Sequence, residues 1–128
     1  PHIHLPLQSG SDRVLRRMRR GYSRDELLAA VERAKEILDC PAFNTDVIVG
    51  FPGETEEAFE RLLEFVQHVR FERLGAFPYS REEETPSSAM KNQVPERVKR
   101  ERYERLMEVQ AKIALENKKD FYMIKYLV

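Results

Sequence analysis

Two kinds of apolar pattern follow one another along the chain, and their order predicts its architecture. Short continuous apolar runs are typical of buried strands, whereas apolar residues repeated every three or four positions are typical of one helix face. The two kinds of block alternate as strand, helix, strand, helix, strand and helix. Strands that alternate with helices pair in parallel through right-handed crossovers. The pattern therefore predicts an α/β fold, either a doubly wound sheet or part of a (β/α) barrel.

The boundaries of these elements can be read from turn and cap residues. We expect strands at residues 2–7, around 47–49 and from about 73 to 79, and helices at 12–20, 23–38, 58–70 and from Pro95 onward. Ser23 and Glu26 form a capping box at the start of the second helix. The run Val47, Ile48 and Val49 shows no polar alternation, which predicts a strand covered on both faces. Residues 121–128 read as a lone strand.

Three strands are too few for a closed barrel, which needs about eight. We therefore expect the chain to be an arc of a larger structure, with poor stability of its own because its edge strands are open. It opens at Pro1 rather than at a methionine, and the lone final strand has no partner, so both ends are expected to be cut.

Composition narrows the class of protein only slightly. The 128 residues are 41% hydrophobic and 34% charged, as in a globular chain, and no segment is expected to span a membrane. Lys+Arg and Asp+Glu both number 22, so the net charge gives no argument for a nucleic-acid or an acidic partner. Cys40 is the single cysteine and cannot by itself hold zinc or an iron–sulfur cluster; we expect it to act as a small hydrophobe near a helix end. No targeting signal is visible, which favours the cytoplasm.

The carboxyl ends of parallel strands form the ligand face of such folds, and here they carry small, polar and aromatic residues. Gln8 and Ser9 follow the first strand and can hydrogen-bond sugar hydroxyls, although turn chemistry explains them equally well. The glycine-rich turn at Gly50 offers main chain to a flat base. Phe77 and Tyr79 can line an apolar slot, but core packing is the stronger interpretation of both.

Other candidate sites in the sequence are weaker. The Gly50 turn is neither a phosphate loop nor a dinucleotide fingerprint, because the residues that complete those motifs are missing. His2 and His4 share one strand face without a third ligand, so no metal site is expected, and no catalytic constellation is complete. A basic run, with further charge on the last helix, suggests a phosphate-contacting patch for RNA, but a solvated helix face is favoured at zero net charge. Its residues are Arg13, Arg16, Arg17, Arg19 and Arg20, with Lys99, Arg100 and Arg102.

Four motifs in order resemble those of the radical S-adenosylmethionine methylthiotransferases. They are His4-Leu5-Pro6-Leu7-Gln8-Ser9-Gly10-Ser11, Met18-Arg19-Arg20-Gly21-Tyr22, Asp46-Val47-Ile48-Val49-Gly50-Phe51-Pro52-Gly53-Glu54-Thr55, and Phe77-Pro78-Tyr79-Ser80 with Thr85-Pro86. The resemblance implies that residues 1–119 are the second half of a partial (β/α) barrel. Residues 120–128 would then be the first strand or linker of an RNA-binding β-domain. The three cysteines that hold the family's [4Fe–4S] cluster are absent here, so its ligands are expected outside this chain.

The resemblance also implies a chemistry and a cofactor site. The whole enzyme would cleave S-adenosylmethionine reductively, with an electron donor, and add a methylthio group to its substrate. Gln8 and Ser9 would contact the ribose or methionine part of the cofactor. Val49 and Gly50 would flank the adenine, with main chain near Phe77 and Tyr79 completing its slot. Without the cluster cysteines, the 128 residues alone are expected to be inactive.

The substrate implied by the resemblance is of two kinds. Gln8-Ser9-Gly10-Ser11 resembles the branch that modifies adenosine derivatives in transfer RNA. The segment 74–80 and the helix around 106–110 resemble the branch that acts on an aspartate of a small-subunit ribosomal protein. Transfer RNA is favoured. The alternative from another class is a non-catalytic β/α binding fragment, in which Gln8 and the Gly50 turn serve only structure.

Overall fold

The computed structural model confirms the predicted order of strands and helices. It describes residues 2–80 and 89–127, with side chains up to residue 120. The elements are β1 (His2–Gln8), α1 (Asp12–Arg17), α2 (Arg24–Ile37), β2 (Ala42–Val49), α3 (Glu56–Val69), β3 (Arg73–Pro78) and α4 (Glu96–Leu127). The Thr85-Pro86 motif lies outside the described residues.

The three strands form one parallel sheet in the order β1-β2-β3, which confirms the α/β class and fits an arc of a (β/α) barrel. The register places Leu5 beside Thr45 and Thr45 beside Leu74. Between Leu5 and Gln8 the pairing of β1 with β2 shifts, close to Pro6, which has no N–H to donate. The Thr45 hydroxyl lies at this shift, donating to the Leu5 carbonyl at 2.5 Å and accepting from the Leu7 N–H at 3.3 Å.

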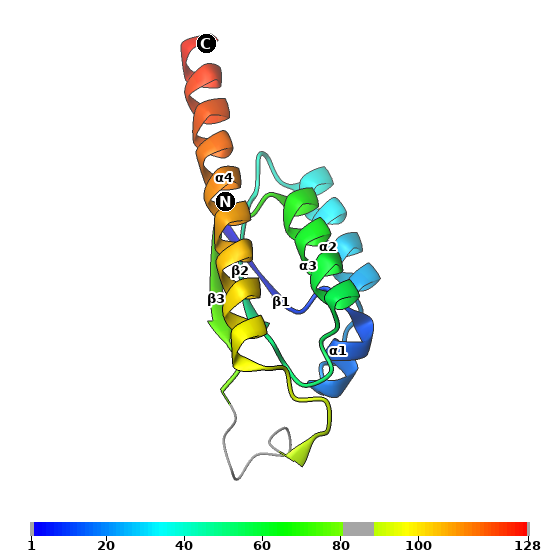
Figure 1. The fold of residues 1–128 in the computed structure, drawn as a ribbon. Coiled ribbons are helices and arrows are strands. Elements are labelled where there is room, and N and C mark those ends of the chain that lie inside the picture. Colours follow the sequence, from blue (N-terminus) through cyan, green and yellow to red (C-terminus); the bar gives the residue numbers. More distant parts are fainter. Residues whose placement is uncertain (1, 81–88, 128) are drawn as a thin grey trace.

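One face of the sheet is covered by helices (Figure 1). Along β2, Phe43, Thr45, Val47 and Val49 are buried, whereas the residues between them are only half-buried. Side chains from α2, α3 and α4 join the buried strand residues in one apolar core. The prediction of a strand covered on both faces is therefore wrong within the described part of the chain. It failed because Ile48, although apolar, lies on the opposite face from its neighbours.

Helix α4 runs along the sheet beside β3 and continues past it (Figure 1). Its backbone stays helical to Leu127, so the strand expected at residues 121–128 is wrong. The assignment of residues 120–128 to a second domain stays a prediction. In the described part of the chain, no helix is long and apolar enough to cross a membrane.

One helix boundary and the exposure of three side chains differ from the prediction. Helix α1 ends at Arg17 rather than Arg20, because the chain turns through a left-handed residue at Arg19 (φ 58°). Ile37 and Leu38, the last apolar residues of the predicted helix 23–38, are exposed. Cys40 is exposed in the connection to β2, so it is not a packed hydrophobe. Ser23 caps α2 as expected, its Oγ accepting from the Glu26 N–H at 3.2 Å.

Candidate functional site

The residues predicted to bind a ligand lie at one edge of the sheet. Strands β1, β2 and β3 end at Gln8, Val49 and Pro78, and because they are parallel their carboxyl ends meet on the same side. The three following turns therefore lie next to one another. The structure thus brings the segments of all six candidates together, although not all six side chains face the same way.

In the turn after β1, the Gln8 side chain is available to a ligand, whereas the Ser9 side chain bonds the turn itself. Gln8 is half-buried in a left-handed conformation (φ 61°), and its amide has no hydrogen bond to another described residue. Ser9 is buried, and its Oγ accepts from the Ser11 N–H at 3.3 Å. A side chain at Gly10 would overlap the main chain of Leu62 on α3, so this turn lies directly against that helix. Gln8 is free for a ligand, whereas the Ser9 hydroxyl stabilises the turn.

The turn after β2 presents main chain rather than side chains. The Val49 side chain is fully buried on the helix-covered face, and its carbonyl accepts from the Tyr79 N–H at 2.8 Å. Gly50 has φ 80°, a conformation that L side chains rarely adopt. Its N–H donates to Glu54 Oε1 at 3.0 Å. Val49 therefore can contact a ligand only through its backbone.

The aromatic residues at the end of β3 have different surroundings. Phe77 is 57% exposed on the open face of the sheet, in register with Ile48, so the expectation that it packs in the core is wrong. Tyr79 is half-buried and meets Phe51 edge-on at a ring distance of 5.3 Å. Ile48 and Phe77 give the open face an apolar end beside the three turns.

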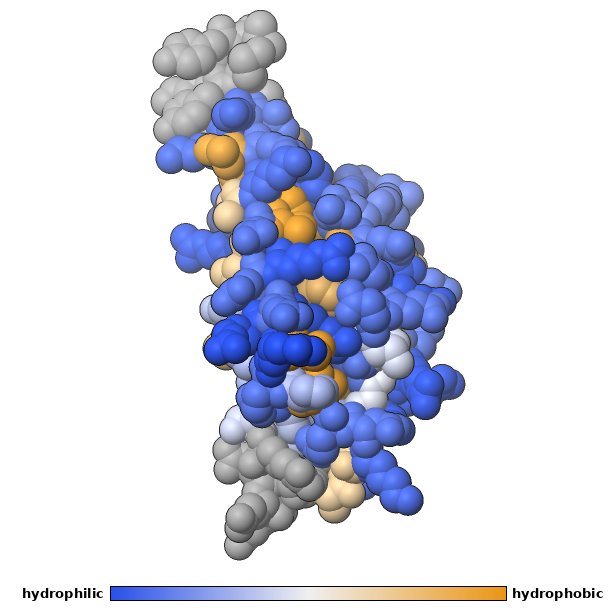
Figure 2. All heavy atoms as spheres, in the orientation of Figure 1, coloured by the Kyte–Doolittle hydropathy of each residue, from blue (hydrophilic) through white to orange (hydrophobic). Residues whose placement is uncertain are grey.

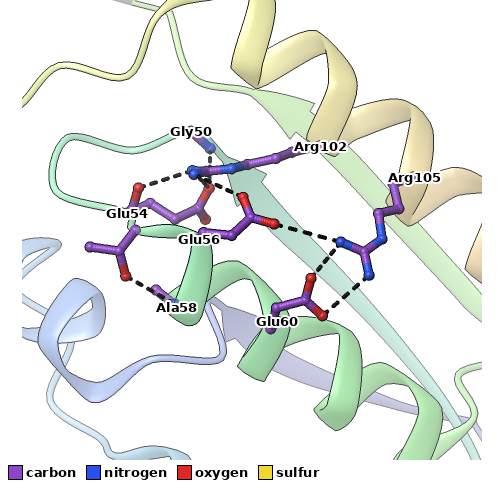
Figure 3. A network of polar contacts seen from close by, with 8 residues as sticks. Gly50, Glu54, Glu56, Ala58, Glu60, Arg102 and Arg105 are labelled. Atoms are coloured by element: carbon purple, nitrogen blue, oxygen red, sulfur yellow. Dashed lines mark hydrogen bonds and ion pairs between the residues drawn. The ribbon is translucent and has the colours of Figure 1, made fainter.

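A buried ion pair behind the Gly50 turn was not predicted (Figure 3). Glu54 Oε1 accepts from both the Gly50 N–H and Arg102 Nη1, the latter at 2.9 Å, and Arg102 Nη1 also donates to the Glu54 carbonyl at 2.9 Å. Burial raises the pKa of Glu54, and the Gly50 N–H and the Arg102 guanidinium lower it by less. Glu56 lies 3.6 Å from Arg102 Nη2 and also faces Arg105, which binds Glu60.

Lys99, one turn before Arg102, reaches the turns after both β2 and β3. Its Nζ donates to the Tyr79 carbonyl at 3.1 Å and to Glu96 at 2.8 Å, and it lies 5.2 Å from the centre of the Tyr79 ring. Its aliphatic stem lies where a side chain at Gly50 would be. Lys99 and Arg102 are buried, so their assignment to a solvated face or an RNA patch is wrong.

The remaining basic residues lie on the surface beside the site. Arg13, Arg16, Arg19 and Arg20 are exposed, and Arg17 is half-buried near the Pro52 carbonyl. A cavity of about 250 Å³ adjoins them; its lining residues are Arg17, Met18, Arg19, Arg20, Ile48, Phe51 and Met90. Figure 2, which shows the helix-covered side, is hydrophilic over most of its area with apolar patches between α3 and α4.

Histidines and acids do not converge on a metal site in the part of the chain described. No group of three or more His, Cys, Asp or Glu side chains could hold an ion there. His4 lies 3.8 Å from Asp46 on the open face; His4 is exposed and Asp46 is half-buried.

Comparison with known proteins points to one superfamily. Residues 1–66 match the family described as the Radical SAM superfamily. The chain is 50% identical over 121 residues to the tRNA-2-methylthio-N(6)-dimethylallyladenosine synthase of Thermobifida fusca, covering 94% of this chain and 24% of that protein. It is 46% identical over 127 residues to the ribosomal protein uS12 methylthiotransferase RimO of Geotalea uraniireducens, covering 99% of this chain and 28% of that protein. The chain spans about a quarter of the length of the curated relatives it matches.

Proposed function

Because this chain belongs to the radical SAM superfamily, we propose that it forms part of a methylthiotransferase that modifies an adenosine derivative in transfer RNA. Proteins of this family use S-adenosylmethionine and a [4Fe–4S] cluster. When bound, these groups supply the radical that removes hydrogen from an unreactive C–H bond, and an electron donor serves the cluster. The contribution of the 128 residues is to bind and orient.

The cluster does not fit the residues present. Cys40 is the only cysteine of the chain, and it precedes β2, at the opposite edge of the sheet from the three turns. The ligands of the cluster therefore come from outside these residues. Inactivity of the 128 residues alone stays a prediction, and so does a cytoplasmic location.

The carboxyl edge of the sheet does fit an adenosyl group. The main chain at Val49 and Gly50 can lie along the flat base, and the exposed Phe77 and its neighbour Ile48 can cover apolar parts of the nucleoside. The free amide of Gln8 can bind hydroxyl or carboxylate oxygens. Ser9 and Tyr79 contribute through the turns that they stabilise.

One observation carries the choice of transfer RNA: a cavity beside this edge combines an apolar floor with a basic rim. Met18, Ile48 and Phe51 line it together with Arg19 and Arg20, both exposed. An unstacked nucleobase needs a flat apolar contact, and its phosphates need cations nearby. The aspartate of a protein substrate is an anion that a single arginine can bind, but it has no flat apolar face to lie on Met18, Ile48 and Phe51.

The experiment uses the full-length protein that contains this chain, reconstituted with its cluster. We expect mass spectrometry to find a methylthio group on transfer RNA and none on the small-subunit ribosomal protein. The double variant Arg19→Gln, Arg20→Gln should bind transfer RNA more weakly and reduce the salt slope of log K by about 1 to 2, because about 0.7 to 0.9 counterions are released per phosphate contact. Arg33→Gln, an exposed arginine on α2, is the matched control.

If the methylthio group were found on the ribosomal protein instead, the chain would belong to the branch of the uS12 methylthiotransferase of Geotalea uraniireducens. Absence of product on either substrate would contradict a methylthiotransferase and favour a non-catalytic binding role.

A further inference from the structure

We propose that Lys99 and Arg102 of α4 are positioning residues that fix the turns after β2 and β3 as the main-chain wall against which S-adenosylmethionine binds. The inference rests on the proposed function, because it assigns these turns to the cofactor. It concerns residues that make no contact with the ligand themselves. Their effect would reach the ligand through Gly50 and Tyr79.

Arg102 holds the turn after β2 through Glu54. A single carboxylate oxygen of Glu54 accepts from the Gly50 N–H at 3.0 Å and from Arg102 Nη1 at 2.9 Å. The same nitrogen also donates to the Glu54 carbonyl, so the guanidinium binds both the main chain and the side chain of one residue (Figure 3). The side chains of Arg102 and Glu54 are 9% and 1% exposed, so water competes little for these bonds. Gly50 is thereby tied to α4.

Lys99 holds the turn after β3 and covers the turn after β2. Its ammonium group donates to the Tyr79 carbonyl, while the Tyr79 N–H donates to the Val49 carbonyl at 2.8 Å. The peptide groups on both sides of Tyr79 are therefore bound. Because the stem of Lys99 fills the space beside Gly50, it also blocks movement of that turn toward the helix.

The helix that carries both cations is itself anchored to the rest of the fold. Gln110 donates to the Phe71 carbonyl at 2.8 Å, near the amino end of β3. Further along, Arg70 binds Glu116 at 3.0 Å and Asn117 at 3.3 Å. Lys99 and Arg102 are three residues apart and so lie on one helix face. Their positions are fixed by contacts that lie far from the turns.

That Glu54 and Arg102 form a buried ion pair favours a positioning role over a purely stabilising one. Burying two charges costs desolvation energy that their attraction often fails to exceed, so a buried ion pair is weak evidence for added stability. What the pair does provide is a defined geometry at Gly50 and Glu54. A binding surface made of main chain cannot adjust to its ligand by changing side-chain rotamers. Its fit to a nucleoside therefore depends on the contacts that hold the backbone in place, here those of Lys99 and Arg102.

The test compares variants of the full-length, cluster-reconstituted protein that contains this chain. S-adenosylmethionine is the probe, with its dissociation constant measured by equilibrium titration and KM and kcat measured on the same samples. Arg102→Gln removes the paired charge, Arg102→Lys keeps a cation of shorter reach, and Lys99→Met keeps the stem over Gly50 but loses the bond to Tyr79. Arg105→Gln is the matched control, because the contacts of Arg105 in the described part of the chain are with Glu56, Glu60 and the Phe59 ring, all on α3, and not with either turn.

We expect Arg102→Gln to weaken cofactor binding and raise KM about tenfold or more, with kcat changed less, because a displaced main-chain wall loses contacts with the bound cofactor and about 1.4 kcal/mol of lost binding energy is tenfold in affinity. Arg102→Lys should recover part of the loss, Lys99→Met should weaken binding by about threefold or more, and Arg105→Gln should match the wild type. If Lys99 and Arg102 served only stability, their variants would unfold at lower temperature, but Arg102→Lys would not regain cofactor binding and KM would not change more than kcat.

Binding within twofold of the wild type in Arg102→Lys and Lys99→Met, with folded protein, would overturn the inference even if Arg102→Gln fails to fold. Failure of the wild type to bind S-adenosylmethionine would instead overturn the proposed function. The two outcomes are therefore distinguishable.

Discussion

At the scale of single residues, Thr45 compensates for an irregularity in β1. Pro6 cannot donate to the sheet, and the register shifts beside it. The buried Thr45 hydroxyl bonds the Leu5 carbonyl and the Leu7 N–H on either side of the proline. A strand that contains proline thus stays attached up to Gln8, where the candidate site begins.

Replacing Thr45 with valine tests this role. Thr45→Val keeps the shape of the side chain but removes the hydroxyl from two buried main-chain groups. We expect the free energy of unfolding to fall by about 1 to 3 kcal/mol, the usual cost of leaving such groups unpaired. Urea unfolding measures this loss, and amide hydrogen exchange should show faster exchange at Leu7. Unchanged exchange at Leu7 would contradict the assignment.

Glu54 should give stability an unusual dependence on pH. Burial raises its folded-state pKa above the ordinary value of 4.5, despite the Gly50 N–H and Arg102. The folded protein therefore binds this proton more tightly than the unfolded chain. The contribution of Glu54 is fully present below the unfolded pKa and is lost as pH rises through the folded pKa.

Comparison with Glu54→Gln isolates that contribution, because glutamine stays neutral. The free energy of unfolding of the wild type minus that of Glu54→Gln should decrease as pH rises above the ordinary pKa of 4.5. Urea unfolding at several pH values provides both quantities. A difference that increases with pH would mean that the Arg102 pairing outweighs burial.

At the scale of elements, the close approach between the turn after β1 and α3 sets the position of Gln8. Gly10 lies against the main chain of Leu62, which cannot move as a flexible side chain can. Gly10→Ala should therefore destabilise the fold by about 1 to 3 kcal/mol, as overpacking does. Gly21→Ala is the control, because a side chain there would meet no atom within 4 Å. Thermal or urea unfolding of both variants gives the comparison, and equal stabilities would contradict the packing.

The elements that sequence predicted well are those with a clear period. Helix α3 has seven buried side chains at helical spacing and begins at Thr55, whose Oγ1 accepts from the Ala58 N–H. A strand was wrongly predicted after Asp120 because the aromatic and branched residues there favour strands locally. From Glu96 onward, however, the chain has no glycine or proline, so nothing interrupts the helix once it has started.

At the scale of the whole molecule, the strand topology made it possible to predict from the sequence that the candidate residues lie together. The side-chain pairs around them could not be predicted in the same way. Parallel strands place their carboxyl ends together, so Gln8, Gly50 and Tyr79 could be assigned to one edge from their order alone. Glu54 and Arg102 are 48 residues apart, and in a chain with 22 cations and 22 acids no local signal selects this pair. The exposure of Phe77 could not be predicted either, because it depends on which face of the sheet the helices cover and not on the sequence of β3 itself.

The buried pair of Glu54 and Arg102 also restricts how this protein can change in evolution. Loss of either charge alone leaves the other buried without its partner, which typically costs about 3 to 5 kcal/mol. Replacement of both by a well-packed apolar pair avoids that penalty, but it passes through one of the two unfavourable single variants. The two positions therefore form an epistatic pair, and a substitution that is tolerated at one depends on which residue occupies the other.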